Sequence, residues 1–163
     1  MARHRELLTA AAIGLLVLAA DQASKAWAQG TLTPGHQVTA INGWLWFRLT
    51  SNSGATLGLL SGHNLLFLAV SGILVVAVVV LLVRGSAAGG LGAAALGAVA
   101  GGAVGNLVDR VRLGSVTDFI EVHLWPTDFN LADAAIRLGV VVFLVALLVS
   151  LGRRPQRGGG RPG

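Results

Sequence analysis

Long apolar stretches alternate with shorter polar segments along the chain. Four of these stretches are long enough for a helix to cross the hydrocarbon core of a bilayer, which takes about 20 residues. They cover about residues 7–27, 64–83, 87–108 and 131–151. The third is mostly glycine and alanine, and such small side chains let neighbouring helices approach closely. The pattern predicts an all-α membrane protein, a four-transmembrane-helix bundle with the third helix at its centre.

The polar segment between the first two predicted helices, about residues 28–63, has a different pattern. Its β-branched and aromatic residues form short runs on either side of Asn42-Gly43, a dipeptide typical of hairpin turns. Trp44 and Trp46 are residues that favour the interface between membrane and water. We therefore expect a small extracytoplasmic β-structure between helices 1 and 2, lying on the membrane surface.

Composition supports a membrane protein and excludes several kinds of site. Of the 163 residues, 54% are hydrophobic and 12% are charged, about half the charged fraction of a soluble domain. The chain has no cysteine, which excludes disulfides, thiol catalysis and cysteine-ligated metals. His123 has no partner at a spacing typical of metal ligands, so we expect no metal and no cofactor. The net charge of +5 lies beside apolar stretches, which favours membrane orientation over nucleic-acid binding.

The basic residues predict the direction of the helices. Arg3 and Arg5 precede the first helix, Arg84 lies between the second and third, and further arginines follow the fourth. Because cytoplasmic segments are enriched in arginine and lysine, both termini are predicted to be cytoplasmic, in the cytoplasmic (inner) membrane. Residues 1–152 are expected to form a single membrane domain, and residues 153–163 a disordered cytoplasmic tail.

The first apolar stretch also has features of a secretory signal peptide, since arginines precede an apolar run. It continues into "DQASKAWAQG" without a clear cleavage site in a flexible segment. We therefore interpret it as a retained first helix.

Charged and amide side chains collect at the predicted extracytoplasmic ends of the helices. They are Asp21, Lys25, Asn52, Asn106, Asp109, Arg110, Asp118, Asn130, Asp133 and Arg137. Structural interpretations exist for several of them. Asp21 and Lys25 have the spacing of a helix ion pair, and Asn130 is placed to cap the fourth helix.

Other polar residues at this end also have structural interpretations. One interpretation makes Asp109 and Arg110 a structural ion pair. Another makes Arg110 and Arg112 surface residues whose side chains extend to the membrane surface. Glu121 and Asp128 would be solvated acids of a loop.

Asp118 and Asp133 flank one short polar segment near the membrane and are not explained by such pairing. An ionisable residue at membrane depth indicates function by default. Two carboxylates that lie close together cannot both ionise easily, so they share a proton. That arrangement suits general acid–base catalysis of the attack of water on an amide.

These residues occur in blocks whose order resembles the lipoprotein signal peptidase family, also called signal peptidase II. The blocks are "DQASKAW" (21–27), "NSGA" (52–55), "GGAVGNLVDR" with "VTDF" (101–119) and "FNLADAAI" (129–136). Each block alone is weakly specific, whereas their order in a chain of this length with four predicted helices is highly specific.

The resemblance implies an intramembrane aspartyl endopeptidase that acts on diacylglyceryl-modified prolipoproteins. Such an enzyme removes the signal peptide by cleaving before the lipidated cysteine, without a metal or cofactor. The resemblance makes Asp118 and Asp133 the catalytic dyad. It implies substrate binding by Asn52, Asn106, Arg110 and Asn130. It implies a supporting role for Asp21, Lys25, Gly54 and Asp109.

The partners implied are the prolipoprotein and membrane lipid, and we expect a monomer. The chain departs from the family pattern at Thr56 and Leu57, where small and aromatic residues are usual. This departure concerns the shape of the pocket wall and leaves the aspartates unaffected.

Two other classes of protein compete with this interpretation. A small transporter or proton-coupled channel would use Asp21, Asp118 and Asp133 as relay carboxylates, but it would place polar groups at the middle of the bilayer. A structural or assembly protein would use the glycine-rich third helix as a packing face, which leaves the two aspartates unexplained.

Overall fold

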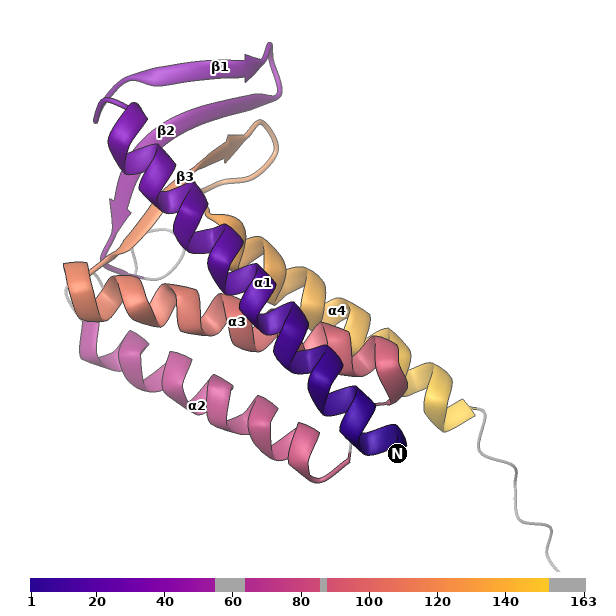
Figure 1. Cartoon of the computed structure of the whole chain (residues 1–163). Coiled ribbons are helices and arrows are strands. Elements are labelled where there is room, and N and C mark those ends of the chain that lie inside the picture. Colours follow the sequence, from indigo (N-terminus) through magenta and orange to yellow (C-terminus); the bar gives the residue numbers. More distant parts are fainter. Residues whose placement is uncertain (55–63, 86–87, 153–163) are drawn as a thin grey trace, which may run out of the picture.

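Four helices and three strands make up the part of the chain that the computed structural model describes, residues 1–54, 64–85 and 88–152. The helices are α1 (Ala2–Thr31), α2 (Asn64–Val83), α3 (Gly89–Leu113) and α4 (Leu131–Gly152). All four are long and apolar enough to cross a membrane, which confirms the predicted fold class. Figure 1 shows the start of α1 and the end of α4 at the same end of the bundle.

The predicted helix bounds hold for α2 and α4 and are too short for the other two. α1 begins at Ala2 and continues to Thr31, because its polar ends also adopt helical structure. α3 runs to Leu113 and therefore carries Asp109 and Arg110 within its last turns. The departure at Thr56 and Leu57 and the predicted tail at 153–163 lie outside the described residues.

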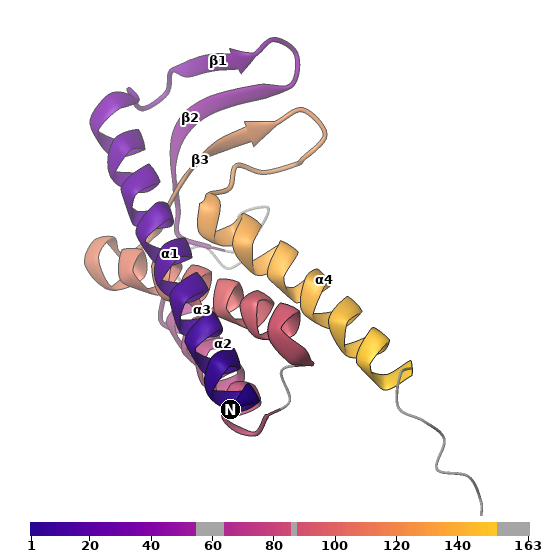
Figure 2. The same ribbon diagram turned by 45° about the vertical axis from the view of Figure 1, so that its right-hand side comes forward.

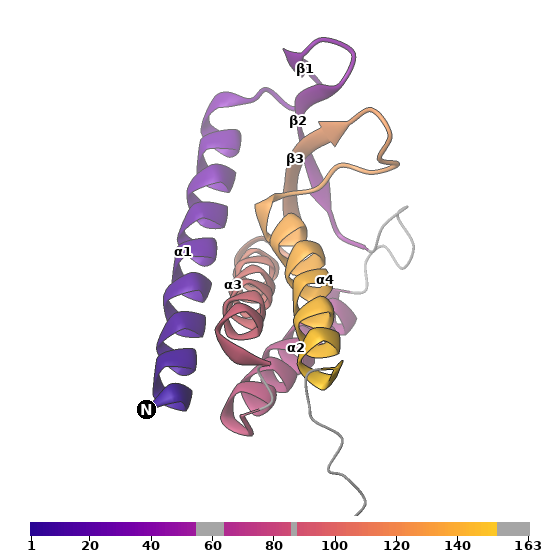
Figure 3. The same cartoon turned by 90° about the vertical axis from the view of Figure 1, so that its right-hand side faces the viewer.

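α3 is the central helix of the bundle. In its most apolar window 61% of the residues are buried, against at most 11% in the corresponding windows of the other helices. Figure 3 shows α3 between α1 and α4. Glycines permit this packing: a Cβ on Gly102 would lie 2.6 Å from the backbone oxygen of Ala132, and one on Gly139 2.9 Å from that of Ala95. The close approach of α3 and α4 fixes the start of α4, where Asp133 lies.

Gly102→Ala is therefore expected to destabilise the protein by about 1–3 kcal/mol, because the added methyl group must push α4 away from α3. Gly72→Ala is the matched control, since a Cβ there meets nothing within 4 Å. Thermal unfolding of both variants in detergent checks this prediction. Equal melting temperatures for the two variants would show that α3 and α4 do not need this close approach.

The three strands form an antiparallel sheet in the order β1-β2-β3. They are β1 (Gln37–Ile41), β2 (Leu45–Asn52) and β3 (Val116–Val122). The first two form the predicted hairpin, and Gly43 in its turn has a φ of +76°. The sequence pattern missed β3, which lies between α3 and α4, so the β-structure is not built from the α1–α2 segment alone.

The sheet lies at the end of the bundle where α1 ends and α4 begins (Figure 2). Ala28, Leu32 and Phe119 form a small buried core between the end of α1 and the sheet. β2 and β3 pair Thr50 with Asp118 and Asn52 with Val116. Asn52 is therefore a diagonal neighbour of Asp118 on the adjacent strand, within reach of its side chain.

Candidate active site

Asp118 lies on β3 with a side chain that is 1% exposed. Its two carboxylate oxygens accept hydrogen bonds from two different elements. Asn52 on β2 donates its amide Nδ2 to Oδ2 at 2.9 Å, and Asn130 donates its Nδ2 to Oδ1 at 2.7 Å. The sheet and the segment before α4 therefore hold this carboxylate in one orientation.

Asp133 lies in the first turn of α4, and Asn106 of α3 donates its Nδ2 to Asp133 Oδ1 at 2.8 Å. Asn130 accepts a hydrogen bond at its Oδ1 from the backbone N–H of Asp133 at 2.9 Å, which confirms that Asn130 caps the helix. The other end of the same amide donates to Asp118. The Asn130 side chain therefore connects both aspartates. It caps α4 with its oxygen and bonds Asp118 with its NH₂ group.

The orientation of all three asparagine amides is fixed by a donor at their oxygen ends. Asn52 Oδ1 accepts from the backbone N–H of Gly54 at 3.0 Å, and Asn106 Oδ1 accepts from Lys25 Nζ at 2.9 Å. Asn130 Oδ1 accepts from the backbone of Asp133. Because these donors can only meet an oxygen, each NH₂ group must face an aspartate. The arrangement aims a donor at Asp118 from two sides and at Asp133 from one.

Lys25 of α1 is 2% exposed and lies between two buried carboxylates. Its Nζ is 2.9 Å from Asp21 Oδ2 and 3.3 Å from Asp109 Oδ2. These acids also bind backbone: Asp21 Oδ1 accepts from the N–H of Ala132 at 2.9 Å, and Asp109 Oδ2 from that of Thr117 at 3.0 Å. The cluster therefore ties α1 and α3 to the start of α4 and to the residue before Asp118.

Arg110 is 9% exposed and stacks on Phe67 of α2, with its guanidinium carbon 5.1 Å from the ring centroid. Its positive charge acts on Asp118, Asp133 and Asp109 together. The alternative of a surface residue is therefore wrong for Arg110, although Arg112 is exposed. The proposed Asp109–Arg110 pair is also not the main contact of Asp109, whose carboxylate bonds Lys25.

The pKa of Asp118 is raised to about 7. Burial contributes most, because it removes water from the charged form, and the neighbouring charge of Asp133 adds to it. The hydrogen bonds from Asn52 and Asn130 and the charge of Lys25 act in the opposite direction. The carboxyl group therefore changes its protonation state near neutral pH, as a general acid or base must.

Two acids that were interpreted as solvated are paired instead. Arg48 donates to both carboxylate oxygens of Asp128 at 3.0 and 3.1 Å, and its Nε is 3.4 Å from Glu121. Asp128 raises the pKa of Arg48 through its hydrogen bond and charge. These contacts join β2 to the segment that leads to Asn130.

The structure also identifies two glutamines that bond residues of the site and that the sequence pattern did not single out. Gln22 donates its Nε2 to Asp21 and to Asp109, both at 3.2 Å, and Gln29 donates to Thr117 at 2.7 Å. Gln22 lies within the block "DQASKAW", and membership of that block was the feature of the sequence that could have identified it. Arg137, in contrast, stacks on Trp125 with 4.8 Å between the guanidinium carbon and the ring centroid.

Comparison with known proteins identifies close relatives over nearly the whole chain. Residues 13–149 match the family model described as signal peptidase (SPase) II. The lipoprotein signal peptidase of Syntrophomonas wolfei is 41% identical over 143 residues, which cover 88% of this chain and 94% of that protein. That of Moorella thermoacetica is 34% identical and covers 87% of this chain and 94% of its own length.

Solved structures give the same result for the fold. One bacterial membrane enzyme, solved at 2.3 Å resolution, matches with a TM-score of 0.82 and 28% identity, over 93% of this chain and 94% of its own. A second, solved at 1.9 Å, matches with a TM-score of 0.76 and 30% identity, over 86% and 92% of the two chains.

Proposed function

This chain belongs to the signal peptidase II family, and we propose that it removes signal peptides from diacylglyceryl-modified prolipoproteins by cleaving before the lipidated cysteine. One observation carries the proposal. Two aspartates from different elements, Asp118 and Asp133, are held by one asparagine and by two further amide donors at one end of the bundle. Such a pair suits an aspartic endopeptidase.

In the proposed mechanism the two aspartates share one proton. The ionised carboxylate takes a proton from water, and the water oxygen attacks the carbonyl carbon of the scissile amide. The protonated partner donates a hydrogen bond to the carbonyl oxygen and later protonates the leaving amine. The C–N bond breaks, which leaves a free carboxylate on the signal peptide and a free amine on the lipidated cysteine.

The other site residues have distinct proposed roles. Arg110 provides positive charge next to the dyad and is proposed to bind the substrate backbone. Asn52, Asn106 and Asn130 donate to the aspartates, so they position the dyad, and their contact with substrate stays a prediction. Asp21, Lys25, Gly54 and Asp109 are proposed as support. These last four act through buried bonds to the asparagines and to the backbone.

Activity is expected to fall as pH rises through about 7, because above the pKa of Asp118 the dyad loses its shared proton. Asn52→Ala removes a hydrogen bond that favours ionised Asp118, so the pKa and the alkaline limb of the profile should rise by about one unit. A pH–rate profile of kcat/KM measures this shift. Ser51→Ala, an exposed neighbour on β2, is the control, and a downward shift for Asn52→Ala would contradict the proposal.

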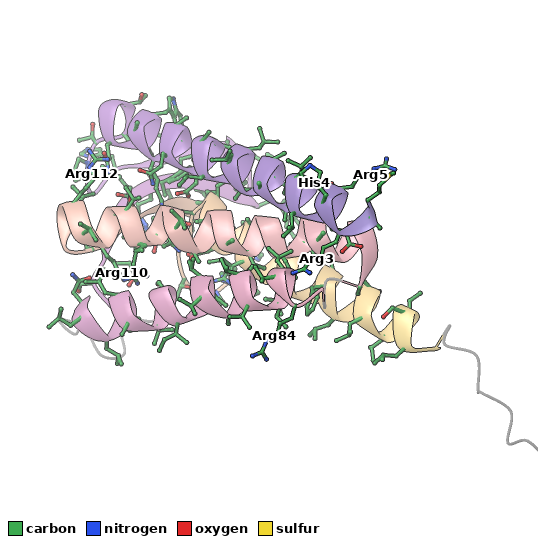
Figure 4. All side chains as sticks on the ribbon, turned by 60° about the horizontal axis from the view of Figure 1, so that its bottom comes forward. Arg3, His4, Arg5, Arg84, Arg110 and Arg112 are labelled. Carbon is green, nitrogen blue, oxygen red and sulfur yellow. The ribbon has the colours of Figure 1, made fainter. Side chains whose placement is uncertain are left out.

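We propose that the dyad lies at the extracytoplasmic face and that both termini are cytoplasmic. Arg3, Arg5 and Arg84 lie at one end of the bundle, away from Arg110 and Arg112 (Figure 4). The positive-inside rule makes the former end cytoplasmic. The protein is proposed to act as a monomer formed by residues 1–152, because one helical bundle holds both aspartates and the amides bonded to them.

The sheet is proposed to lie on the membrane and guide the diacylglyceryl group. Trp44 is 57% exposed, and Trp44 and Trp46 both pack beside His123. Replacing both tryptophans with Ala is expected to raise KM for lipidated substrate with little change in kcat, because surface binding precedes chemistry. If the double variant had the same KM and kcat as the wild type in liposomes, the sheet would not guide the diacylglyceryl group.

The experiment that tests the function compares two forms of one prolipoprotein, with and without the diacylglyceryl group, as substrates of the purified protein in lipid. We expect cleavage of the lipidated form, before its modified cysteine. A transporter would cleave neither form. The clustering of the buried acids at one end of the bundle argues against a transport pathway, which needs polar groups near the middle of the bilayer.

A further inference from the structure

A pocket lies between α4 and the loop that leads from β3 to α4 (Figure 2). Its volume is about 410 Å³, within the range of about 300–1,000 Å³ that is usual for small-molecule sites. Two backbone hydrogen bonds hold the loop: the N–H of Trp125 donates to Val122 O at 2.9 Å, and that of Phe129 to Ile120 O at 3.0 Å. The aromatic wall of the pocket is therefore fixed to the sheet.

Arg137 of α4 places a positive charge inside this pocket, whose other lining residues are apolar. Its guanidinium carbon lies 4.8 Å from the ring centroid of Trp125 and 5.7 Å from that of Phe129. Aromatic rings contact the flat face of a guanidinium group, whereas its five N–H donors point outwards in the plane of the group. The rings therefore hold the cation in place and leave its donors for a ligand.

The acids nearest to Arg137 along the chain are bound to other partners. Asp133, one turn earlier on α4, accepts from an asparagine of α3 at 2.8 Å. Asp128 and Glu121 both pair with Arg48. In the part of the chain that the structure describes, no carboxylate forms an ion pair with Arg137. The pocket therefore keeps its positive charge.

The lining of the pocket changes from charged to apolar along α4. Helical side chains lean towards the N-terminus of their helix, so Arg137 reaches back towards the start of α4 and the sheet. Leu138 and Val141 line the pocket further along the helix and are 66% and 57% exposed. In the orientation proposed above, the cation is nearest to the extracytoplasmic surface and the apolar residues lie deeper. A phospholipid has the same order, with its phosphate at the surface and its acyl chains below.

Charge distinguishes the two kinds of lipid that could occupy such a pocket. The diacylglyceryl group of a prolipoprotein is uncharged, so it would leave the guanidinium without a counter-ion, which is unfavourable at membrane depth. An anionic phospholipid supplies a phosphate, which arginine binds through short and directed hydrogen bonds. Charge complementarity therefore favours the anionic phospholipid.

We propose that this pocket binds one anionic phospholipid of the extracytoplasmic leaflet, with its phosphate at Arg137 and an acyl chain along Leu138 and Val141. The described residues that line the pocket do not include Asp118 or Asp133, so the site is separate from the dyad. A bound lipid would cover the outer side of the first turns of α4. The proposal rests on the orientation proposed above and not on cleavage.

The first arm of the test measures head-group preference. Native mass spectrometry of the full chain in detergent is used to titrate phosphatidylglycerol and phosphatidylethanolamine with identical acyl chains. We expect tighter binding of phosphatidylglycerol, and a loss of about fivefold in that affinity for Arg137→Gln. Arg137→Lys keeps the charge and should keep the preference, which separates the loss of charge from a fault in folding.

Arg112→Gln is the matched control for this arm. It removes the same charge from an exposed position at the dyad end of the bundle (Figure 4) and should leave the affinity unchanged. If both glutamine variants lost affinity equally, the lipid would respond to the total charge of the protein and not to the pocket. That result, or equal affinity of the wild type for the two lipids, would overturn the proposal.

The second arm places the lipid at Trp125 in vesicles. Bromine atoms on an acyl chain quench tryptophan on contact, and the difference between the wild type and Trp125→Phe isolates the emission of Trp125. We expect brominated phosphatidylglycerol to quench this emission more than brominated phosphatidylethanolamine at the same mole fraction, and Arg137→Gln to abolish the excess. Equal quenching by the two lipids in the wild type would overturn the proposal.

A competitor tests the substrate as the alternative occupant. Unlabelled phosphatidylglycerol is expected to relieve the quenching of Trp125, whereas a diacylglyceryl-modified peptide should not. If the peptide relieved it as well as the phospholipid, the pocket would belong to the substrate and the proposal would be wrong. Neither arm measures cleavage, so the result is independent of the peptidase function.

Discussion

Asp118→Asn and Asp133→Asn are each expected to lower kcat for prolipoprotein cleavage by at least about 10³-fold, within the range attributed to general acid–base catalysis. Asparagine keeps the shape of the side chain but can neither accept the proton from water nor return one to the leaving amine. Because the two carboxyl groups work as a unit, the double variant should be no slower than the slower single variant. Rates from single-turnover cleavage measure all three.

Asp128→Asn is the matched control for this prediction. It makes the same chemical change two residues before Asn130, at an acid that pairs with a partly exposed arginine. Asparagine keeps an oxygen that can accept from Arg48, and the hydrogen bonds of the Asp128 side chain go to Arg48 and not to the dyad, so its kcat should stay within about threefold of the wild type. If Asp128→Asn were as slow as the dyad variants, a general disturbance of this segment would explain all three results.

Lys25→Met is expected to destabilise the folded protein by about 3–5 kcal/mol, because it leaves two buried carboxylates without their cation. Asp21 and Asp109 are 0% and 3% exposed, so water cannot take the place of the ammonium group. The change also removes the donor that fixes the amide of Asn106, and with it the donor aimed at Asp133. Thermal and denaturant unfolding in detergent measure the loss.

Two comparisons separate the buried charge from the loss of side-chain volume. Arg112→Met removes an exposed cation of the same bundle and is expected to change stability by less than about 0.5 kcal/mol. Combining Lys25→Met with Asp21→Asn and Asp109→Asn removes the unpaired charges and should recover part of the lost stability. If Lys25→Met unfolds like Arg112→Met, the cluster does not hold the helices together.

The helical bundle was predictable because transmembrane helices carry a strong local signal. Length and hydropathy alone identify α2 and α4 at nearly their observed bounds. The central place of α3 follows from its glycines, since Gly97 lets the backbone of Ala10 on α1 approach and Gly102 that of Ala132 on α4. The ends of α1 and α3 were missed because polar residues such as Asp109 continue the helix, and their side chains form bonds within the protein.

The site was predictable as a set of residues and not as a geometry. Asp118, Asp133 and the three asparagines stood out because polar groups are rare in such a chain. The strand β3 that carries Asp118 was not predicted, because it is only seven residues long and its partner strand β2 is distant in the sequence. The Arg48–Asp128 pair was also invisible, since it joins residues 80 positions apart.

The most direct test of the central claim separates binding of the lipidated prolipoprotein from its cleavage. Equilibrium binding and single-turnover cleavage would be measured on the same preparations of wild type, Asp118→Asn and Asp133→Asn in lipid. We predict that all three bind the substrate with similar affinity and that only the wild type cuts before the lipidated cysteine. Cleavage at that bond by either variant at a rate near that of the wild type would contradict the assignment of Asp118 and Asp133 as the catalytic pair.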